Sequence, residues 1–553
     1  MKHLALAVLR ILNKKEKQQL SSLIALDLLI GVLDIAFLGL MLLVINFYTK
    51  GGAANTAIHL QRYFSSTSLW LIGGFLLLFA LKNGLGYLIS KWQYFFFYRV
   101  ASRLSRRNIL QYLKDSYLNF IHVDSSVQIR RISQQPVEFS NYILTNVQQV
   151  ISQSILIGFT VLAILFYKPA LFLLLFVLLL PPVILLAWFI RKRLKNIRAD
   201  NKTTGEKVIQ HLQESLSGYV ESNVYGKNDF FVGRYHTYQN RLNSNIATQQ
   251  TLQGLPARLI EVFAILGFFI LIALNKWLGH APGIDLLNIG VFMAASYKII
   301  PGIVKILNST GQIKAYEFTL TDLQPTAGEA STAAQANAHI SSVKFDGVSF
   351  AYKSQPVVNR CSFEITAGDF AGISGRSGLG KTTLVNLLLG FIEPQSGGIA
   401  INDKPATAAN RQQYWKRISY VKQQPFLIND TVLKNITLSD GPYDAEKLAA
   451  VTAICGIDKM PGENTGGINK QITEHGKNMS GGQRQRLMLA RALYHDFDLL
   501  ILDEPFSEMD AEAENAILAR LKQLTQNGKM IMLITHNRDS LAFCNKLISP
   551  DGN

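Results

Sequence analysis

Apolar residues dominate the first part of the chain, where six predominantly apolar stretches alternate with polar segments. These stretches lie near residues 20–47, 68–90, 139–166, 170–190, 259–278 and 284–307. Each is long enough for a helix that crosses a bilayer, which takes about 20 residues. The fourth stretch contains Pro181 and Pro182, which we expect to kink its helix rather than end it. The pattern predicts an all-α transmembrane domain with six helices over residues 1–322.

Basic residues are distributed unevenly between these stretches. The long polar segments 91–138 and 191–258 are rich in Lys and Arg, whereas the alternate loops are short and carry few. Cytoplasmic loops carry an excess of Lys and Arg, so the long segments and both termini are predicted to be cytoplasmic. Apolar residues continue at helical spacing into the long segments, which predicts helices that extend into the cytoplasm. Residues 1–12 are predicted to form a short amphipathic helix on the inner membrane surface.

The hydrophobic pattern changes after residue 322. Residues 323–339 are small and polar without apolar periodicity, which is typical of a linker. Residues 340–553 then alternate short β-rich runs with helical stretches, which predicts an α/β domain with a largely parallel sheet. The predicted strands are Val343–Phe350, Phe370–Ile373, Ser419–Val421, Leu499–Leu502, Met530–Ile534 and Lys546–Ser549.

The composition supports a protein that lies partly in a bilayer. Of 553 residues, 48% are hydrophobic and only 17% are charged, and the mean hydropathy is +0.17. Soluble globular domains have about 25% charged residues, so these values argue against a disordered chain, a coiled coil and an ordinary cytosolic enzyme. The basic cytoplasmic segments account for the net charge of +17, and we expect no nucleic-acid partner. The three cysteines are too scattered for a disulfide scaffold or a zinc site.

A glycine-rich loop with phosphate-binding spacing follows the predicted strand Phe370–Ile373. It fits the P-loop pattern G-x-x-x-x-G-K-[ST] and comprises Gly375, Arg376, Ser377, Gly378, Leu379, Gly380, Lys381 and Thr382, followed by Thr383. Backbone N–H groups of such a loop and of the helix after it bind phosphate oxygens. Lys381 is expected to neutralise the β- and γ-phosphates of ATP, and the Thr382 hydroxyl to hold Mg²⁺. A structural glycine turn would not explain Lys and Thr at these positions.

Two carboxylates follow the apolar run Leu499–Leu502. Asp503 suits the role of an acidic group that holds Mg²⁺. Glu504 is expected to point to the other side of the strand end and to polarise the attacking water. Two charges that merely cap a strand would explain an isolated pair, but not a pair that occurs downstream of a P-loop. The two motifs together predict an ATP hydrolase.

The residues between these motifs carry a family resemblance. Met479-Ser-Gly-Gly-Gln483 differs at one position from the LSGGQ signature of ABC transporters, and the set of motifs resembles their ATP-binding cassette. The resemblance implies that Tyr352 stacks on adenine, that Gln423 senses Mg²⁺ and that His536 is the switch histidine. It also implies a further group of nucleotide-binding residues, namely Ser480, Gly481, Gly482, Gln483 and Asp510. In this scheme the catalytic residues are Glu504, His536 and Gln423, and the Mg²⁺ contacts are Thr382, Gln423 and Asp503.

Six spans fused to one cassette resemble a half-transporter of the exporter type. In that family two chains dimerise, and each ATP lies between the P-loop of one chain and the signature of the other. Because this chain keeps Glu504 and an intact signature, we expect a homodimer with two competent sites, which also agrees with the frequency of two-fold assemblies. Lys422, Phe506 and the pair Glu508–Met509 depart from the usual family motifs. None removes a catalytic atom, but they leave rate and coupling open.

The membrane half also resembles the lipid-linked oligosaccharide flippase branch of bacterial exporters. The matching features are the run Ile11–Lys17, Asp34, Lys82 and Tyr297–Pro301. This resemblance implies export or flipping of a lipid-linked or otherwise anionic amphipathic substrate across a bacterial plasma (inner) membrane. A peptide exporter and an ATP-gated channel or regulator with the same cassette remain alternatives. Importers are disfavoured, because most keep their membrane and ATPase parts on separate chains.

Several ionisable residues lie within or beside the predicted spans. Asp34 and Lys82 lie near the middle of the first two spans, where they either pair across adjacent helices or line a water-filled cavity separately. Lys298 and Lys305 project from one face of the sixth span, which favours an anionic substrate if that face lines the central passage. Alternatively, Lys305 lies in the cytoplasmic extension and Lys298 pairs with a carboxylate such as Glu261.

Overall fold

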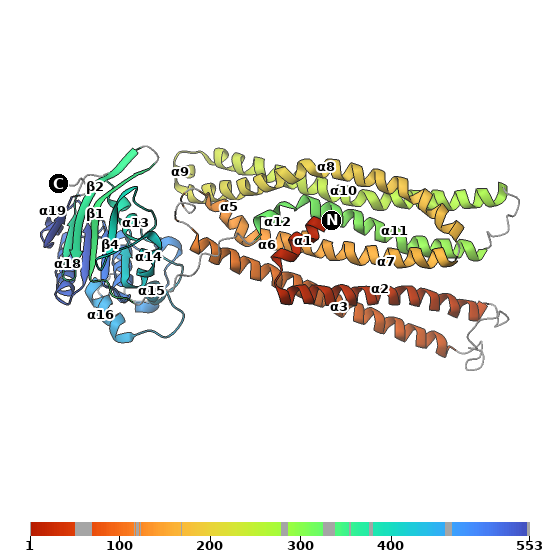
Figure 1. The fold of residues 1–553 in the computed structure, drawn as a ribbon, viewed down its shortest axis with the longest axis horizontal. Helices are drawn as coiled ribbons and strands as arrows, with labels where there is room; N and C mark the ends of the chain where they lie inside the picture. Colours follow the sequence, from red (N-terminus) through yellow and green to blue (C-terminus); the bar gives the residue numbers. More distant parts are fainter. Residues whose placement is uncertain are drawn as a thin grey trace. The chain divides into compact units, whose positions relative to one another are not determined.

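The computed structural model describes residues 2–49, 69–115, 117, 121, 123–167, 169–277, 286–324, 338–352, 355–374, 380–458 and 467–549. The chain divides into a helical unit, which comprises Met1–Asp115 and Ile121–Ala327, and a cassette unit, which comprises Ser116–Phe120 and Gly328–Asn553. Figure 1 shows long helices in the first unit, and sheets with shorter helices in the second. Residues 325–337 of the predicted linker lie outside the described residues.

In the described part of the chain, each of the six predicted spans falls mainly on a long helix, and only residues 139–144 of the third lie on a separate short helix. The long helices are α2 (Lys14–Thr49), α3 (Trp70–Lys114), α7 (Thr145–Tyr167), α8 (Pro169–Ser217), α10 (Asn228–Trp277) and α11 (Leu286–Ala315). The prediction that Pro181 and Pro182 do not end their helix is confirmed, because α8 runs over 49 residues. At 1.5 Å per residue it is about 70 Å long, more than twice the thickness of a hydrocarbon core. This helix is therefore long enough to extend well beyond a bilayer, as the sequence pattern predicts.

Shorter helices fill the remainder of the helical unit. They are α1 (Lys2–Ile11), α5 (Ser125–Ile129), η2 (Arg130–Gln134), α6 (Gln135–Glu138), η3 (Phe139–Leu144), α9 (Tyr219–Val224) and α12 (Phe318–Asp322). The predicted N-terminal helix is present as α1, and Arg103 of α3 joins it to α2. The Arg103 guanidinium donates to the carbonyl of Ile11 at 3.1 Å and to Glu16 Oε1 at 2.6 Å. These contacts hold the turn between α1 and α2 against α3.

Two helical stretches in the described part of the chain are long and apolar enough to cross a membrane. They are Lys14–Met41 and Trp70–Lys114, whose most apolar 18-residue windows have mean hydropathies of 2.4 and 1.6. Only 6% and 11% of their most apolar windows are buried within the structure. An apolar helix in a soluble core would be mostly buried, so these exposed surfaces suit contact with lipid.

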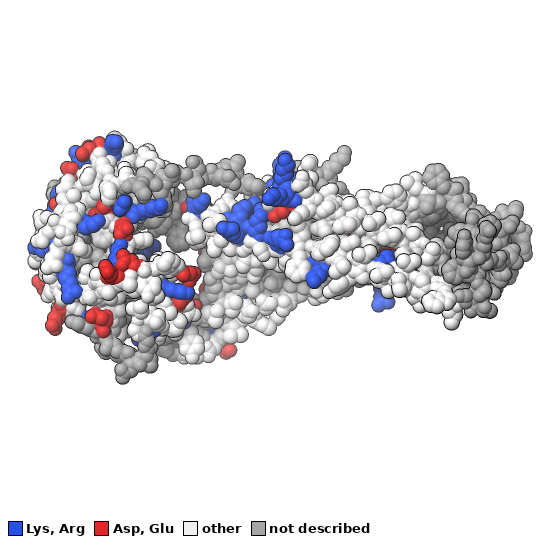
Figure 2. Space-filling view, turned by 90° about the horizontal axis from the view of Figure 1, so that it is seen from below, with Lys and Arg blue, Asp and Glu red and all other residues white. Residues whose placement is uncertain are grey.

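Charged side chains gather on one part of the helical unit. In the view of Figure 2, Lys and Arg cluster on one portion of its surface, and the neighbouring surface carries few charges. The exposed cations at the start of α2 and in the second half of α3 include Lys14, Lys15, Lys17, Lys91, Arg99 and Arg106. These helix ends are the ones that the positive-inside rule predicts to be cytoplasmic.

The cassette unit contains a parallel and an antiparallel sheet. The parallel sheet has the strand order β6-β7-β8-β3-β9 and consists of β3 (Phe370–Ile373), β6 (Ile418–Val421), β7 (Leu499–Asp503), β8 (Met530–Ile534) and β9 (Lys546–Ile548). The antiparallel sheet has the order β2-β1-β4-β5 and consists of β1 (Ser342–Tyr352), β2 (Gln355–Thr366), β4 (Ser396–Ile401) and β5 (Lys404–Pro405). The predicted parallel sheet is thus confirmed. The predicted strand Val343–Phe350 instead belongs to the antiparallel sheet, because its residues alternate between buried and exposed positions.

The parallel sheet is covered on both faces. Leu500 and Leu533 pack with residues of the helices on one face, whereas Leu499 and Ile501 pack with α13 and the antiparallel sheet on the other. Successive strand residues point to opposite faces, so a strand covered on both sides is apolar throughout. The helices of this unit are α13 (Lys381–Leu388), α14 (Ala408–Gln413), η4 (Trp415–Arg417), α15 (Val432–Thr437), α16 (Ala445–Cys455), η5 (Gly467–Asn469), η6 (Glu474–Gly476), α17 (Gly481–Tyr494), α18 (Ala511–Gln526) and α19 (Arg538–Leu541). Because the parallel strands are largely apolar and buried, the polar catalytic candidates lie in the loops that follow them.

Candidate functional site

Five predicted site residues lie at the carboxyl ends of neighbouring parallel strands. Lys381 follows β3, Gln423 follows β6, Asp503 ends β7 with Glu504 directly after it, and His536 follows β8. The strand order places β6, β7, β8 and β3 side by side. Ligands of open α/β sheets bind outside the carboxyl ends of the strands. The topology therefore brings residues that are far apart in the sequence to one edge of the sheet.

The start of α13 positions Lys381. Gly380 has a φ of 77°, and a Cβ at this position would lie 2.6 Å from the carbonyl oxygen of Val357. Only glycine fits there, and this turn lets Lys381 open the helix with a buried side chain. The other P-loop residues, Gly375, Arg376, Ser377, Gly378 and Leu379, lie outside the described residues. On α13 itself, Thr382 is exposed and Thr383 is buried.

Glu504 is the centre of the cluster. Its φ of 49° is in the left-handed region, which a non-glycine residue adopts only when its surroundings hold it there. Its Oε1 atom lies 3.1 Å from His536 Nε2 and 3.8 Å from Lys381 Nζ. Its Oε2 atom accepts a hydrogen bond from Gln423 Nε2 at 2.8 Å. Lys381 Nζ also lies 2.6 Å from His536 Nε2. The carboxylate is thus contacted by groups from the start of α13 and from the loops after β6 and β8.

Asp503 is the more buried of the two carboxyl groups. Burial raises its pKa above the ordinary value, and the neighbouring Glu504 charge raises it further. Hydrogen bonds from Tyr420 and Thr382 and the charge of Lys381 lower this pKa. Two adjacent acidic groups beside a hydroxyl form an oxygen-rich set, which is the ligand chemistry that Mg²⁺ prefers. The residues present therefore fit a Mg²⁺ ion.

Tyr420 is a residue of this site that the sequence motifs did not predict. Its hydroxyl lies 3.4 Å from Asp503 Oδ2, because β6 and β7 are paired in parallel with Tyr420 opposite Ile501. Burial, followed by the Asp503 charge, raises the pKa of Tyr420, so the phenol stays protonated and donates. The available signal in the sequence was a tyrosine with a hydroxyl group in a short strand, three residues before Gln423.

Tyr117 also belongs to the cassette unit, where its ring stacks on Phe391 at 4.6 Å between centroids.

The signature residues form the start of α17. Ser480 is the N-cap, and its hydroxyl accepts a hydrogen bond from the Gln483 N–H at 3.3 Å. In return, Gln483 Oε1 accepts from the Ser480 N–H at 3.1 Å, which completes a capping box. Gly481 and Gly482 are the first two residues of the helix. The start of a helix presents N–H groups without intrahelical partners and therefore favours anions.

Two further predicted nucleotide contacts lie on other elements. Asp510 is the N-cap of α18 and accepts a hydrogen bond from the Ala513 N–H at 2.7 Å. Tyr352 ends β1, and 40% of its surface is exposed. Its ring meets Phe350 edge to face at 4.9 Å, which leaves a face available for stacking. The structure thus gathers Lys381, Gln423, Asp503, Glu504 and His536, and holds the signature residues, Asp510 and Tyr352 on separate elements.

The helical unit contains the predicted ion pair. Lys82 Nζ contacts Asp34 Oδ1 and lies 4.7 Å from the ring centroid of Phe79 and 5.7 Å from that of Phe37. The prediction that Asp34 and Lys82 pair across adjacent helices is confirmed. The side chain of Lys298 lies outside the described part of the chain, and Lys305 is exposed.

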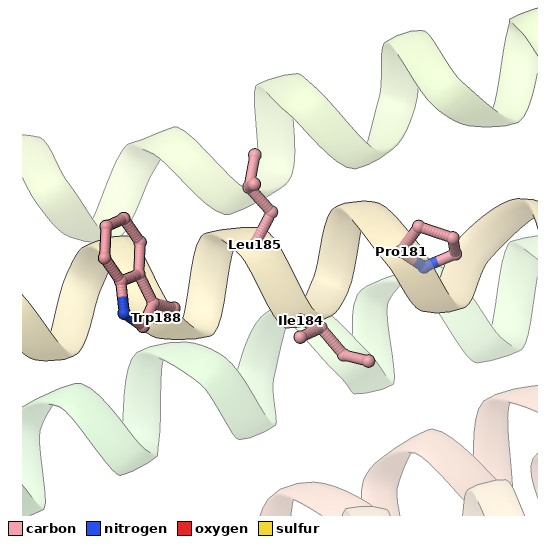
Figure 3. Close-up of a pocket in the computed structure, with 4 residues that line it drawn as sticks. All are labelled: Pro181, Ile184, Leu185 and Trp188. Carbon is pink, nitrogen blue, oxygen red and sulfur yellow. The ribbon is translucent and has the colours of Figure 1, made fainter.

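An apolar groove of about 480 Å³ lies along α8. It is lined by Pro181, Ile184, Leu185 and Trp188, which recur at helical spacing. Figure 3 shows that all four side chains come from this one helix. Apolar lining suits contact with hydrocarbon, but it carries no charge that would recognise a particular head group.

Two family models match most of the chain. The ABC transporter transmembrane region matches residues 20–294, and the ABC transporter model matches residues 358–507. An ATP-dependent lipid A-core flippase of Burkholderia orbicola is 26% identical over 465 residues, which cover 80% of this chain and 77% of the relative. A flippase with the same name from Paraburkholderia xenovorans is 27% identical over 437 residues, which cover 77% and 72%. A putative export ATP-binding/permease protein of Rickettsia felis is 37% identical over 203 residues, which cover 36% and 35%.

A solved structure has the same fold. It is a bacterial Atm1-family ABC exporter with ATP bound, and it matches with a TM-score of 0.76 at 19% identity over 97% of this chain and 93% of that chain. The predicted order of a membrane region followed by an ATP-binding cassette is confirmed. The chain belongs to the ABC transporters, integral membrane proteins that couple ATP hydrolysis to transport, and has the half-transporter architecture of an exporter.

Proposed function

We propose that the chain forms a homodimer that uses Mg²⁺ and ATP to flip or export a lipid-linked or otherwise anionic amphipathic substrate. The observation that carries the ATPase assignment is the environment of Glu504, which Lys381, Gln423 and His536 contact at one sheet edge. A carboxylate held by several polar groups beside a phosphate-binding helix can orient water and accept its proton. The cluster therefore supports hydrolysis in addition to nucleotide binding.

Each residue of the cluster has a chemically distinct role in this proposal. Lys381 neutralises phosphate charge, and Glu504 is the general base. Mg²⁺ supplies charge neutralisation at the phosphates when it is bound. Its ligands are drawn from Thr382, Gln423 and Asp503. His536, which lies within hydrogen-bond distance of both Lys381 and Glu504, orients the base toward the phosphates.

The remaining predicted residues suit a site shared by two chains. Ser480, Gly481, Gly482 and Gln483 present the start of α17 to a nucleotide held by the P-loop of the partner chain, and Asp510 lies at the start of α18. Tyr352 stacks on adenine from its own chain. Because one chain carries both Glu504 and the signature, a homodimer contains two complete sites. A closed two-fold assembly is also the commonest oligomer.

The substrate class and the membrane are supported by different observations. The similarity to lipid A-core flippases extends over both the membrane region and the cassette. Exposed apolar surfaces on α2 and α3, with exposed cations at adjoining helix ends, suit an inner membrane with the cassette in the cytoplasm.

A reconstitution experiment tests this function. The purified protein is placed in liposomes, and ATP hydrolysis is measured with lipid-linked sugars, anionic lipids or peptides present. We expect stimulation by an anionic lipid or a lipid-linked sugar and none by peptides. Stimulation by peptides alone would contradict the substrate class. A passive current without ATP-dependent net movement would favour the channel alternative.

A further inference from the structure

The loop between β7 and α18 places an acidic side chain against the start of α17. Glu508 lies in this loop, four residues after Glu504. A Cβ added to Gly481 would lie 1.4 Å from Glu508 Oε2, so the carboxylate is in direct contact with Gly481. A Cβ on Gly482 would lie 2.9 Å from the carbonyl oxygen of Glu508. Both signature glycines are therefore needed to let residue 508 approach the helix.

Further contacts hold Glu508 in this position. Its backbone N–H donates to Gln485 Oε1 at 3.0 Å, and its Oε2 atom lies 3.5 Å from Arg484 Nη2. Gln485 and Arg484 both belong to the first turns of α17. The side chain of Glu508 nevertheless remains 49% exposed. The carboxylate thus stands beside the first turn of the signature helix and stays accessible from outside.

The charge of Glu508 acts on the same helix end that nucleotide is proposed to meet. The first turn of a helix favours an anion through its free N–H groups and its dipole. The Glu508 carboxylate already supplies negative charge beside this helix start. It also repels the phosphates of a nucleotide that approaches the same turn. Pairing with Arg484 also uses a cation that would otherwise attract phosphate.

We propose that Glu508 is a built-in brake on ATP-driven closure of the two cassettes, because its carboxylate opposes the phosphates that the signature helix receives from the partner chain. The inference rests on the proposed function, since only a shared site brings nucleotide to this end of α17. The brake raises the ATP concentration at which the cassettes close. It involves no change in the groups that perform hydrolysis.

The test measures ATP-dependent dimerisation of the cassettes in the full-length protein. The background is Glu504→Gln, which prevents turnover and traps the closed state. Distances between spin labels or fluorophores on the two cassettes are followed as ATP is added. We expect Glu508→Gln to lower the ATP concentration for half-maximal closure by about five- to tenfold, the size expected for one charge at a partly exposed site. Glu512→Gln, which alters an exposed acid in the first turn of α18, is the matched control and should leave this concentration unchanged.

Salt separates an electrostatic brake from a packing effect. Raising the salt concentration shortens the range of charge interactions, to about 3 Å at 1 M. The effect of Glu508→Gln on the half-maximal ATP concentration should therefore shrink at high salt. An unchanged or higher half-maximal ATP concentration for Glu508→Gln would overturn the proposal, and so would an equal effect of Glu512→Gln. Failure of the Glu504→Gln background itself to close with ATP would instead contradict the proposed function.

Discussion

Lys82 in the helical unit and Lys381 in the cassette unit are equally shielded, with 8% of each side chain exposed, but their surroundings differ. Lys82 meets the carboxylate of Asp34 near the rings of Phe37 and Phe79. Lys381 faces His536 and a carboxylate, Glu504, that also interacts with other polar groups. In the helical unit, one ion pair lies beside aromatic rings. In the cassette unit, several polar groups surround the two carboxylate oxygens of Glu504.

This contrast separates a structural use of buried charge from a chemical one. The ion pair beside the two rings joins α2 to α3 and so holds these helices together. In the cassette unit, Lys381 can turn to phosphate while the Glu504 carboxylate keeps its contacts with Gln423 and His536, so that neither charge is left unpaired. We therefore expect changes at the two sites to affect different measurements.

The largest expected effect is on ATP turnover. Glu504→Gln should reduce steady-state hydrolysis by about 10²- to 10⁴-fold, the usual contribution of a general base. Binding of a fluorescent ATP analogue should persist, because Lys381 and the start of α13 are unchanged. Phosphate release and equilibrium binding measured on the same preparation check both parts. Near wild-type turnover would show that another group is the base.

The ion pair in the helical unit should affect stability. Lys82→Met removes the ammonium group that pairs with Asp34, and breaking a buried pair costs about 3 kcal/mol of unfolding free energy. Thermal unfolding in detergent measures this loss. Each single reversal, Asp34→Lys or Lys82→Asp, should also destabilise the protein, and the double reversal should recover part of that loss. A double variant no more stable than either single reversal would contradict the idea that the two charges stabilise one another.

Nucleotide binding should depend on Lys381. Lys381→Ala removes a charged hydrogen-bond donor, which is worth about 2 kcal/mol, and should weaken ATP binding roughly 30-fold. Affinities for ATP and for adenosine are measured for both proteins. Only the affinity for ATP should fall, because Lys381 contacts phosphates and adenosine has none. An equal loss of affinity for adenosine would indicate a general disruption of the cassette.

The smallest expected effect concerns the Mg²⁺ ligands. Tyr420→Phe removes the hydroxyl that donates to Asp503, and one such hydrogen bond is worth about 1 kcal/mol. The Mg²⁺ concentration needed for tight nucleotide binding should rise about fivefold, while binding without Mg²⁺ stays the same. Tyr414→Phe, which alters a ring packed against the same core, is the matched control. Equal behaviour of both variants would remove Tyr420 from the site.

Parts of the fold that depend on uniform burial could be predicted from the sequence. Phe370–Ile373 and Met530–Ile534 are strands with the predicted bounds, because every residue in them is apolar and buried. β2 and β4 were not predicted. Exposed polar residues such as Arg360 interrupt the hydrophobic pattern of β2, and four of the six residues of β4 are incompletely buried. Strands with one exposed face give a weaker signal than strands buried on both faces.

Some residues of the site could be predicted from the sequence, and others could not. Lys381, Asp503 and Glu504 belong to contiguous motifs whose residue types state their chemistry. Tyr420 and Glu508 act through neighbours that are distant in the sequence. Tyr420 reaches Asp503 only because of the register between β6 and β7, and Glu508 reaches Gly481 only because its loop lies against α17. Neither contact can be predicted from the spacing of the residues in the chain.

The central claim is that hydrolysis at Glu504 drives movement of an anionic lipid. The most direct measurement is the net transfer of a fluorescent anionic lipid between leaflets of proteoliposomes, detected with an impermeant quencher. We predict transfer by the wild-type protein that requires Mg²⁺ and ATP, and loss of this transfer in Glu504→Gln. Equal transfer with and without ATP, or by both proteins, would contradict the account.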